Sequence, residues 1–173
     1  SKPSSCAGEP ASRTPLASAP QQTALIVADF NPYLFPNSIN DLAEITRAVD
    51  GQNIYGDFNL RYKKFRGDLI RKRDLTSKYH PKDESFGQFF TRSARVVKMI
   101  EKEFDGQTVL VVGHSQQQAM MITRMLKGEK PHPAVLFDTF NEHFMEHCAL
   151  TTLEYSYRTG WKMISFNSQT HLK

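Results

Sequence analysis

The sequence predicts a three-layer α/β fold, with a mostly parallel sheet between helices on both faces, and three observations lead to this prediction. Residues 107–113 hold four consecutive apolar residues and end in glycine, as a strand covered on both faces does. Helical patterns over 83–104 and 116–127 lie directly before and after this strand. Helix, strand and helix in this order form a right-handed parallel crossover, the building unit of such a sheet.

The helix over 83–104 is predicted because its apolar residues recur every three or four positions. These residues are Phe86, Phe90, Val97, Ile100 and Phe104. Further on, the sequence predicts a helix near 134–145 and strands near 149–155 and 161–166. The short link before Gly160 makes these two strands an antiparallel hairpin.

In the amino-terminal half, residues 1–20 are rich in Ser, Pro and Ala and predict a flexible tail before a folded domain, 21–173. A strand is predicted over 23–30, ended by the prolines that follow it. A helix is predicted over 39–49. Residues 51–82 show no clear period and predict an extended excursion over the surface.

Size and composition restrict the class of protein. A chain of 173 residues suits one domain with a single core. No apolar run approaches the roughly 18 residues of a membrane span, so no membrane association is expected. Two cysteines, Cys6 and Cys148, do not resemble a disulfide framework and favour a cytoplasmic location. The chain begins with Ser1 and not with Met, which predicts a fragment or a processed form.

The net charge is +4 at pH 7, and basic residues concentrate between Arg61 and Lys82. A solvated basic loop is the favoured interpretation. Nucleic acid is not expected as a partner, because the aromatic residues there follow no regular platform for base stacking. This charge favours anionic partners, and a homodimer is also expected.

The candidate site is Gly113-His114-Ser115, where the predicted strand ends and a helix begins. Functional side chains of α/β proteins gather at such strand ends. The backbone amides of the following helix would face the same point, and such amides bind anions. The alternative for His114 is a core histidine bonded to a backbone carbonyl.

One interpretation of this motif is the nucleophile elbow of α/β-hydrolases, with Ser115 as the nucleophile. Asp138 and His171 would then complete the catalytic triad in the order Ser, acid, His. The elbow requires a small residue two places after the serine, and this chain has Gln117 there.

A second interpretation rests on several segments that follow one another in a particular order. They are residues 24–35, the run Asp83-Glu84-Ser85-Phe86 with Phe90 and Arg92 behind it, residues 109–115, Leu126-Lys127-Gly128, and residues 148–154 with Gly160-Trp161. In this order they resemble the carboxyl-terminal portion of the histidine phosphatase superfamily, which has the phosphoglycerate mutase-like fold. Within the superfamily, they are most similar to the TULA (Sts) branch.

This resemblance implies a phosphate site, and it implies a phosphorylated small molecule or a phosphoprotein as the partner. In the superfamily, a histidine of an Arg-His-Gly motif becomes phosphorylated, and a second histidine with two arginines holds the phosphate. His114 matches the second histidine, and Ser115 lies beside it. Arg13 is a faint match to one of the arginines. No cofactor and no metal are implied.

The catalytic groups of the superfamily have no match in the chain. No Arg-His-Gly occurs in it, and the place of the proton-donating acid holds Pro36 and Asn37. The sequence therefore predicts an incomplete domain that does not turn over phosphomonoesters, because the covalent route needs a nucleophile. A non-catalytic phosphate-binding or scaffold module is the alternative. A longer polypeptide that supplies the missing strand would be an active phosphatase.

His143 and His147 stand four residues apart, a spacing found in zinc sites. No third ligand is evident near them, and their order differs from His-Glu-x-x-His. An exposed polar helix face is the favoured interpretation.

Overall fold

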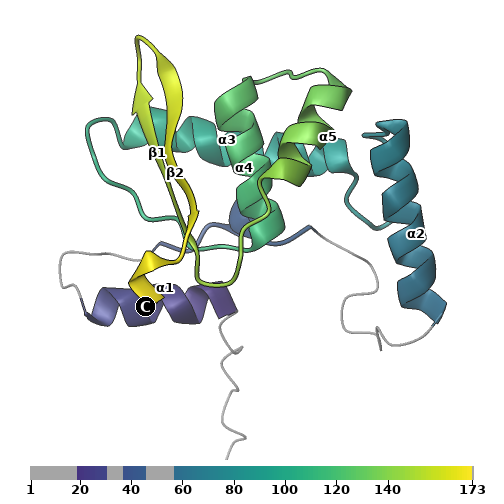
Figure 1. Cartoon of the computed structure of the whole chain (residues 1–173), viewed down its shortest axis with the longest axis horizontal. Coiled ribbons are helices and arrows are strands. Elements are labelled where there is room, and N and C mark those ends of the chain that lie inside the picture. Colours follow the sequence, from purple (N-terminus) through teal and green to yellow (C-terminus); the bar gives the residue numbers. More distant parts are fainter. Residues whose placement is uncertain (1–18, 31–36, 46–56, 173) are drawn as a thin grey trace, which may run out of the picture. The chain divides into compact units, whose positions relative to one another are not determined.

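The computed structural model describes residues 19–30, 37–45 and 57–172, and for residues 57–59 it describes the backbone alone. The chain divides into two compact units, Ser1–Asn37 and Ser38–Lys173. The first unit contains the helix α1 (Ala19–Asp29). The second unit contains the other described helices and both described strands (Figure 1).

The helix α1 forms where the sequence predicted a strand over 23–30, so that prediction is wrong. A continuous apolar run does not by itself separate strand from helix. Ala19, Gln21 and Gln22 before the run are good helix formers, and Pro20 lies in the first turn of α1, where proline is tolerated. The Thr23 hydroxyl donates to the Ala19 carbonyl at 3.0 Å, as helical geometry allows. No residue of α1 is buried, and Leu25 and Ile26 are 52% and 58% exposed. Of the predicted tail, residues 1–18 lie outside the described part of the chain.

The predictions for 39–49 and 51–82 also require correction. Over 39–45 the structure has only the 3-10 turn η1 (Asn40–Leu42), and residues 43–45 are not helical, while 46–49 are not described. In place of an extended excursion, the helix α2 (Asp57–Lys72) forms. Its long Arg, Lys and Leu side chains favour a helix, and Phe65 and Leu69, four residues apart, face the core.

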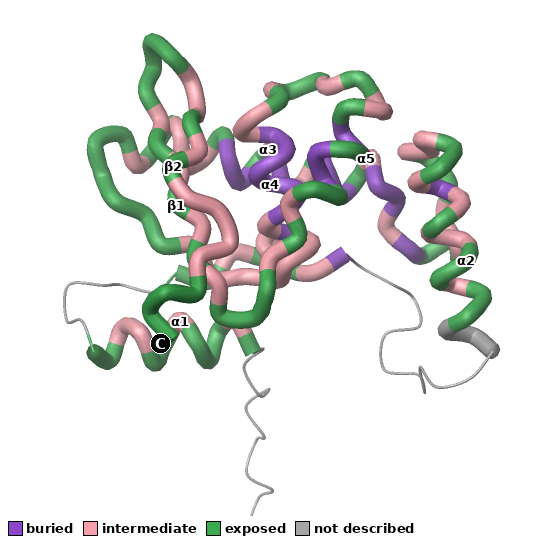
Figure 2. Tube along the Cα trace, viewed as in Figure 1, coloured by how far each residue is buried: buried purple, intermediate pink, exposed green. Residues whose placement is uncertain are grey.

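Three helices form the centre of the second unit: α3 (Phe86–Glu103), α4 (Ser115–Lys127) and α5 (Pro133–Glu142). All three were predicted, with slightly different ends. Ser85 caps α3 through a capping box, in which its hydroxyl accepts from Gln88 N and the Gln88 side chain accepts from Ser85 N. The buried residues concentrate on these helices (Figure 2).

Aromatic residues fill most of the core between these helices. Phe89, Phe137 and Phe140 are fully buried, and Phe86 is 2% exposed. The Phe86 ring meets those of Phe137 and Phe140 edge to face, with centroids 5.0 and 5.6 Å apart. A second cluster contains Val96, Val97 and Met121, with Trp161 packed against it.

Residues 107–113 do not form the predicted strand. They run between α3 and α4 without a strand partner (Figure 1). Within the described residues, the backbone N–H and C=O groups from Thr108 to Gly113 make no hydrogen bond. Val109 and Leu110 are 38% and 52% exposed. A strand exists only with a neighbour, so the predicted parallel sheet and its crossover are not found among the described residues.

The described strands are β1 (Leu150–Ser156) and β2 (Gly160–Ser168), which form the predicted antiparallel hairpin. Gly160 has a φ of 74°, a left-handed conformation that glycine adopts at little cost, and it begins β2 after the turn. The Trp161 indole N–H donates to Glu101 on α3 at 2.7 Å, which attaches the hairpin to the helices. The 3-10 turn η2 (Thr170–Leu172) follows.

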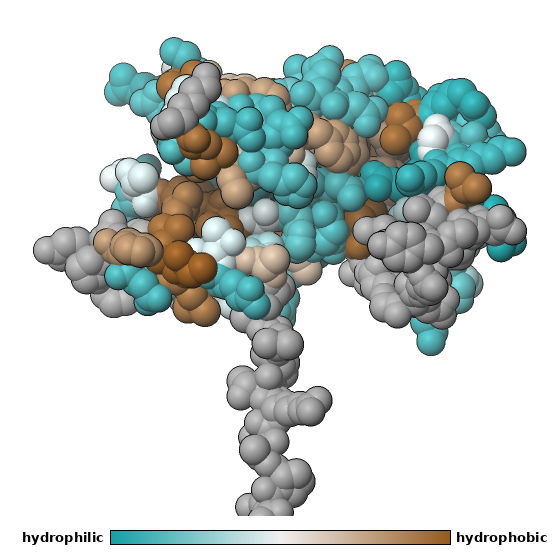
Figure 3. All heavy atoms as spheres, turned by 60° about the horizontal axis from the view of Figure 1, so that its bottom comes forward, coloured by the Kyte–Doolittle hydropathy of each residue, from teal (hydrophilic) through white to brown (hydrophobic). Residues whose placement is uncertain are grey.

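The basic residues from Arg61 onward are solvent-exposed as predicted, with Arg61, Lys63 and Lys64 all exposed, but they lie on the helix α2 and not on a loop. Hydrophilic residues predominate across the upper part of the face in Figure 3. Arg66 lies over the Phe86 ring at 5.6 Å, and Arg73 pairs with Asp138 at 2.6 Å. None of the helices in the described segments has both the length and the apolar composition needed to cross a membrane.

We expect Gly87→Ala to lower the free energy of unfolding by about 1–3 kcal/mol through overpacking. A Cβ at this position would lie 3.0 Å from the Leu75 carbonyl oxygen, which accepts a hydrogen bond from Gly87 N at 2.8 Å. The matched control is Gly67→Ala in α2, where a Cβ meets nothing within 4 Å. That exposed helical site should gain about 0.5–1 kcal/mol. If urea unfolding shows that both substitutions change the free energy of unfolding in the same direction, this explanation is contradicted.

Candidate functional site

His114 lies where the chain enters α4. It is the N-cap residue, with extended backbone angles (φ −88°, ψ 151°), and its carbonyl accepts from Gln118 N at 2.9 Å. Its side chain makes no capping hydrogen bond, and 39% of it is exposed. The imidazole is therefore accessible at the head of a helix and is not the buried core histidine that was its alternative.

The first turn of α4 presents donors beside this imidazole. Among the described residues, the backbone N–H groups of Ser115, Gln116 and Gln117 have no hydrogen-bond partner. Such amides, together with the helix dipole, favour an anion at the start of a helix. The start of α4 can therefore hold a small anion.

Ser115 joins the start of α4 to the segment after α5. Its hydroxyl accepts from Met145 N at 2.9 Å and donates to Met145 O at 3.0 Å. Asp138 pairs with Arg73, and His171 lies in η2. In the described part of the chain, no hydrogen bond connects Ser115 with Asp138 or His171.

A carboxylate that the sequence did not suggest lies beside His114. Glu44 Oε2 is 4.0 Å from His114 Nδ1, and the other oxygen, Oε1, accepts from Ile45 N at 2.9 Å. One quarter of the Glu44 side chain is exposed. The sequence predicted a helix over 39–49, and nothing in that pattern indicated that the Glu44 side chain lies near His114. No sequence signal identified this carboxylate.

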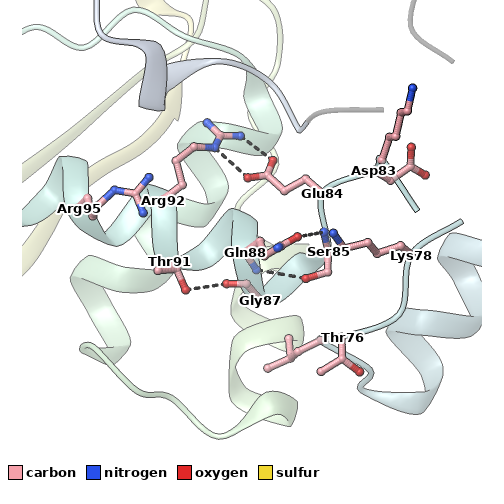
Figure 4. A pocket seen from close by; sticks show the side chains of 12 residues that line it. Thr76, Lys78, Asp83, Glu84, Ser85, Gly87, Gln88, Thr91, Arg92 and Arg95 are labelled. Carbon is pink, nitrogen blue, oxygen red and sulfur yellow. Dashed lines mark hydrogen bonds and ion pairs between the residues drawn. The ribbon is translucent and has the colours of Figure 1, made fainter. Parts of the chain in front are cut away.

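Arg92 on α3 holds the segment that carries Glu44. Its Nε and Nη2 donate to both carboxylate oxygens of Glu84, at 2.9 and 2.8 Å (Figure 4). Its Nη1 donates to the carbonyls of Asp41 and Ala43, at 2.6 and 2.8 Å, and its Nη2 to that of Glu44 at 3.3 Å. Glu84 and Arg92 both belong to a motif that the sequence singled out, but these backbone contacts were not predicted.

Gln117 has a structural function that sequence reasoning missed. The residue is fully buried, and its Nε2 donates to the Asp41 carbonyl at 2.9 Å. Its Oε1 accepts from the Ser93 hydroxyl at 3.2 Å. The large side chain that departs from the hydrolase elbow thus connects α4 to α3 and to η1.

Of the other predicted site residues, Arg13 and Pro36 lie outside the described residues, and Asn37 is exposed. His143 Nδ1 contacts the Thr139 carbonyl at 2.6 Å, and His147 is exposed. Within the described segments, no group of three His, Cys, Asp or Glu residues could hold a metal ion.

Comparison with known proteins gives one match. No curated protein and no solved structure is significantly similar to the chain. A family model, described as histidine phosphatase superfamily (branch 1), matches residues 19–169, which is most of the chain. The match includes the head of α4 with His114, as well as α3 and the hairpin. The chain therefore belongs to the histidine phosphatase superfamily, branch 1.

Proposed function

We propose that this domain binds phosphate groups at the head of α4 and does not turn over phosphomonoesters. The observation that carries the proposal is the accessible His114 imidazole at the N-cap of α4, together with three first-turn amides that have no partner among the described residues. Imidazole and amide N–H groups both donate to phosphoryl oxygens, and the helix dipole adds to the attraction. The ligand is a phosphorylated small molecule or a phosphoprotein.

The absence of turnover rests on the sequence. Phosphoryl transfer through a phosphohistidine requires a nucleophile, and the chain contains no Arg-His-Gly motif. Glu44 is the carboxylate next to His114, and an acid alone, without the nucleophile, cannot start the covalent route. Binding is therefore the function that these residues support.

The test has two measurements. In an NMR titration with inorganic phosphate, the amide signals of residues 115–117 should move in the wild type, and the movement should be lost in His114→Ala. His147→Ala, which removes an exposed histidine outside the site, is the control and should titrate like the wild type. Glu44→Gln should bind phosphate more tightly, because it removes a negative charge beside the ligand.

The second measurement is the release of phosphate from an aryl phosphate at mildly acid and neutral pH. Wild type, His114→Ala and Ser115→Ala should give the same background rate. Turnover that depends on His114 would show an active phosphatase, and turnover that depends on Ser115 alone would support a hydrolase. Unmoved amide signals at 115–117 would defeat the binding proposal.

We also propose that the domain has the mostly parallel, three-layer sheet of a phosphoglycerate mutase-like fold, in which residues 107–113 pair with a strand that the described residues do not supply, and that the chain lies nearest the TULA branch. Within the described residues, the backbone groups from Thr108 to Gly113 have no hydrogen-bond partner, and they enclose a run of four apolar residues, which supports such a pairing. Hydrogen exchange provides the test: slow exchange at Val109 to Val112 is expected for a paired strand. Exchange as fast as in an open loop would contradict it.

A further inference from the structure

An open hollow of about 660 Å³ lies between the segment 75–82 and the first half of α3 (Figure 4). We call it the α3 pocket. The residues that matter for its chemistry are Thr76, Lys78, Lys82, Gln88, Thr91 and Arg95. His114 and the first turn of α4 do not line it. Its volume is that of a small-molecule site.

The two carboxylates in the wall of the α3 pocket are already engaged. Both carboxylate oxygens of Glu84 accept hydrogen bonds from Arg92. Asp83 is 5% exposed, and its carboxylate accepts from His80 N at 2.9 Å. Neither carboxylate is therefore available to neutralise a further cation in the pocket.

Two lysines supply positive charge that the pocket itself does not balance. Lys78 is partly buried, and in Figure 4 its side chain extends toward Ser85 across the pocket. Lys82 is exposed at the rim. Neither ammonium group has a carboxylate within ion-pair distance among the described residues. Arg95 also lines the pocket, but it pairs with Asp41.

The neutral groups of the α3 pocket add donors. Gln88 uses Oε1 to accept from Ser85 N, and within the described residues its Nε2 amide makes no hydrogen bond. The Thr76 and Thr91 hydroxyls donate to Asp74 and to the Gly87 carbonyl. The groups left for a ligand are thus two ammonium groups and one amide NH₂, all of them donors.

The segment that carries Lys78 is held in place by Asp74. Its carboxylate accepts from the Ser77 hydroxyl and from Thr76 N and Ser77 N, at 2.5, 2.8 and 3.0 Å. These hydrogen bonds, that of the Ser77 side chain first, lower the pKa of Asp74 well below its ordinary value. These bonds fix the turn before Lys78, and the hydrogen bond from Gly87 N to the Leu75 carbonyl, at 2.8 Å, attaches that turn to α3.

We propose that the α3 pocket is a second anion site, which binds the phosphate end of a phosphorylated small molecule through Lys78, Lys82 and Gln88. Ammonium groups bind phosphate as point charges, and the amide adds direction. The cavity is larger than one phosphate, so it also takes an organic portion, which would contact Leu75 and the floor at Gly87. This site is independent of the one proposed at α4.

The test is an NMR titration of the full chain with inorganic pyrophosphate. Amide signals of residues 76–82 and 85–88 should move in the wild type. The double variant Lys78→Gln/Lys82→Gln should bind pyrophosphate at least roughly tenfold more weakly, as measured from these amide signals. The reason is that each charged hydrogen bond contributes substantially to binding. Lys98→Gln/Lys102→Gln, which removes two exposed lysines of α3 outside the pocket, is the matched control and should bind like the wild type.

Two further variants serve as controls for folding and for the α4 site. Lys78→Arg/Lys82→Arg retains the charge and should bind within a few-fold of the wild type, which excludes a folding defect as the cause of lost binding. His114→Ala should leave the signals of 76–82 unaffected. Signals that move only at 115–117, or equal losses in the two double glutamine variants, would overturn the α3 pocket without deciding the α4 proposal.

Discussion

Replacing Arg92 by alanine will lower the free energy of unfolding by about 3–5 kcal/mol, because it leaves a nearly buried carboxylate without its cation. The side chains of Arg92 and Glu84 are 12% and 13% exposed. The substitution also removes the donors to three backbone carbonyls between Asp41 and Glu44, and the contact of the guanidinium with the Phe89 ring at 4.9 Å. Urea unfolding of both proteins measures the difference.

Arg95→Ala is the matched control for Arg92→Ala. Arg95 is also on α3 and also makes two hydrogen bonds to one carboxylate, that of Asp41. Its side chain is 59% exposed, so water replaces the pair at little cost. We expect a much smaller loss than for Arg92→Ala. Equal losses would show that burial does not determine the contribution of these two pairs to stability.

Phe137→Ala will lower the free energy of unfolding by about 3–5 kcal/mol, the range found when a phenylalanine is removed from a core. The Phe137 ring is fully buried on α5 and meets Phe86 of α3 edge to face. The loss has two parts: the favourable free energy of burying the ring is lost, and a cavity is left between two helices. Thermal and urea unfolding should both report it.

Phe144→Ala provides the comparison for Phe137→Ala. Phe144 contacts Phe140 edge to face, at 4.9 Å between centroids, but it is 40% exposed. The substitution leaves no closed cavity, so its cost should be well below that of Phe137→Ala. If Phe144→Ala proves equally destabilising, the core extends beyond α5.

The elements that the sequence predicted correctly are those whose pattern is local. The helix α3 has an apolar stripe and a capping box, and the hairpin has a short turn at Gly160. The strand predictions for 23–30 and 107–113 rested on apolar runs, and such a run becomes a strand only when a neighbour pairs with it. The helix α2 was missed because charged residues and Gly67 conceal its narrow apolar face.

At the candidate site, the sequence identified His114 through its place before a helix, and the structure places it at the head of α4. Glu44 was not predicted, because it meets His114 only through the tertiary contacts of Arg92. The buried link that Gln117 makes with Ser93 and Asp41 depends on residues distant in sequence, so no spacing rule could reveal it.

The way Arg92 holds residues 41–44 has an evolutionary consequence. Its guanidinium binds their main-chain carbonyls, which every amino acid possesses. The side chain at position 44 can therefore change from one descendant to another while the attachment persists. A fixed arginine with a replaceable neighbour gives selection a place to vary the chemistry next to His114 without rebuilding the scaffold.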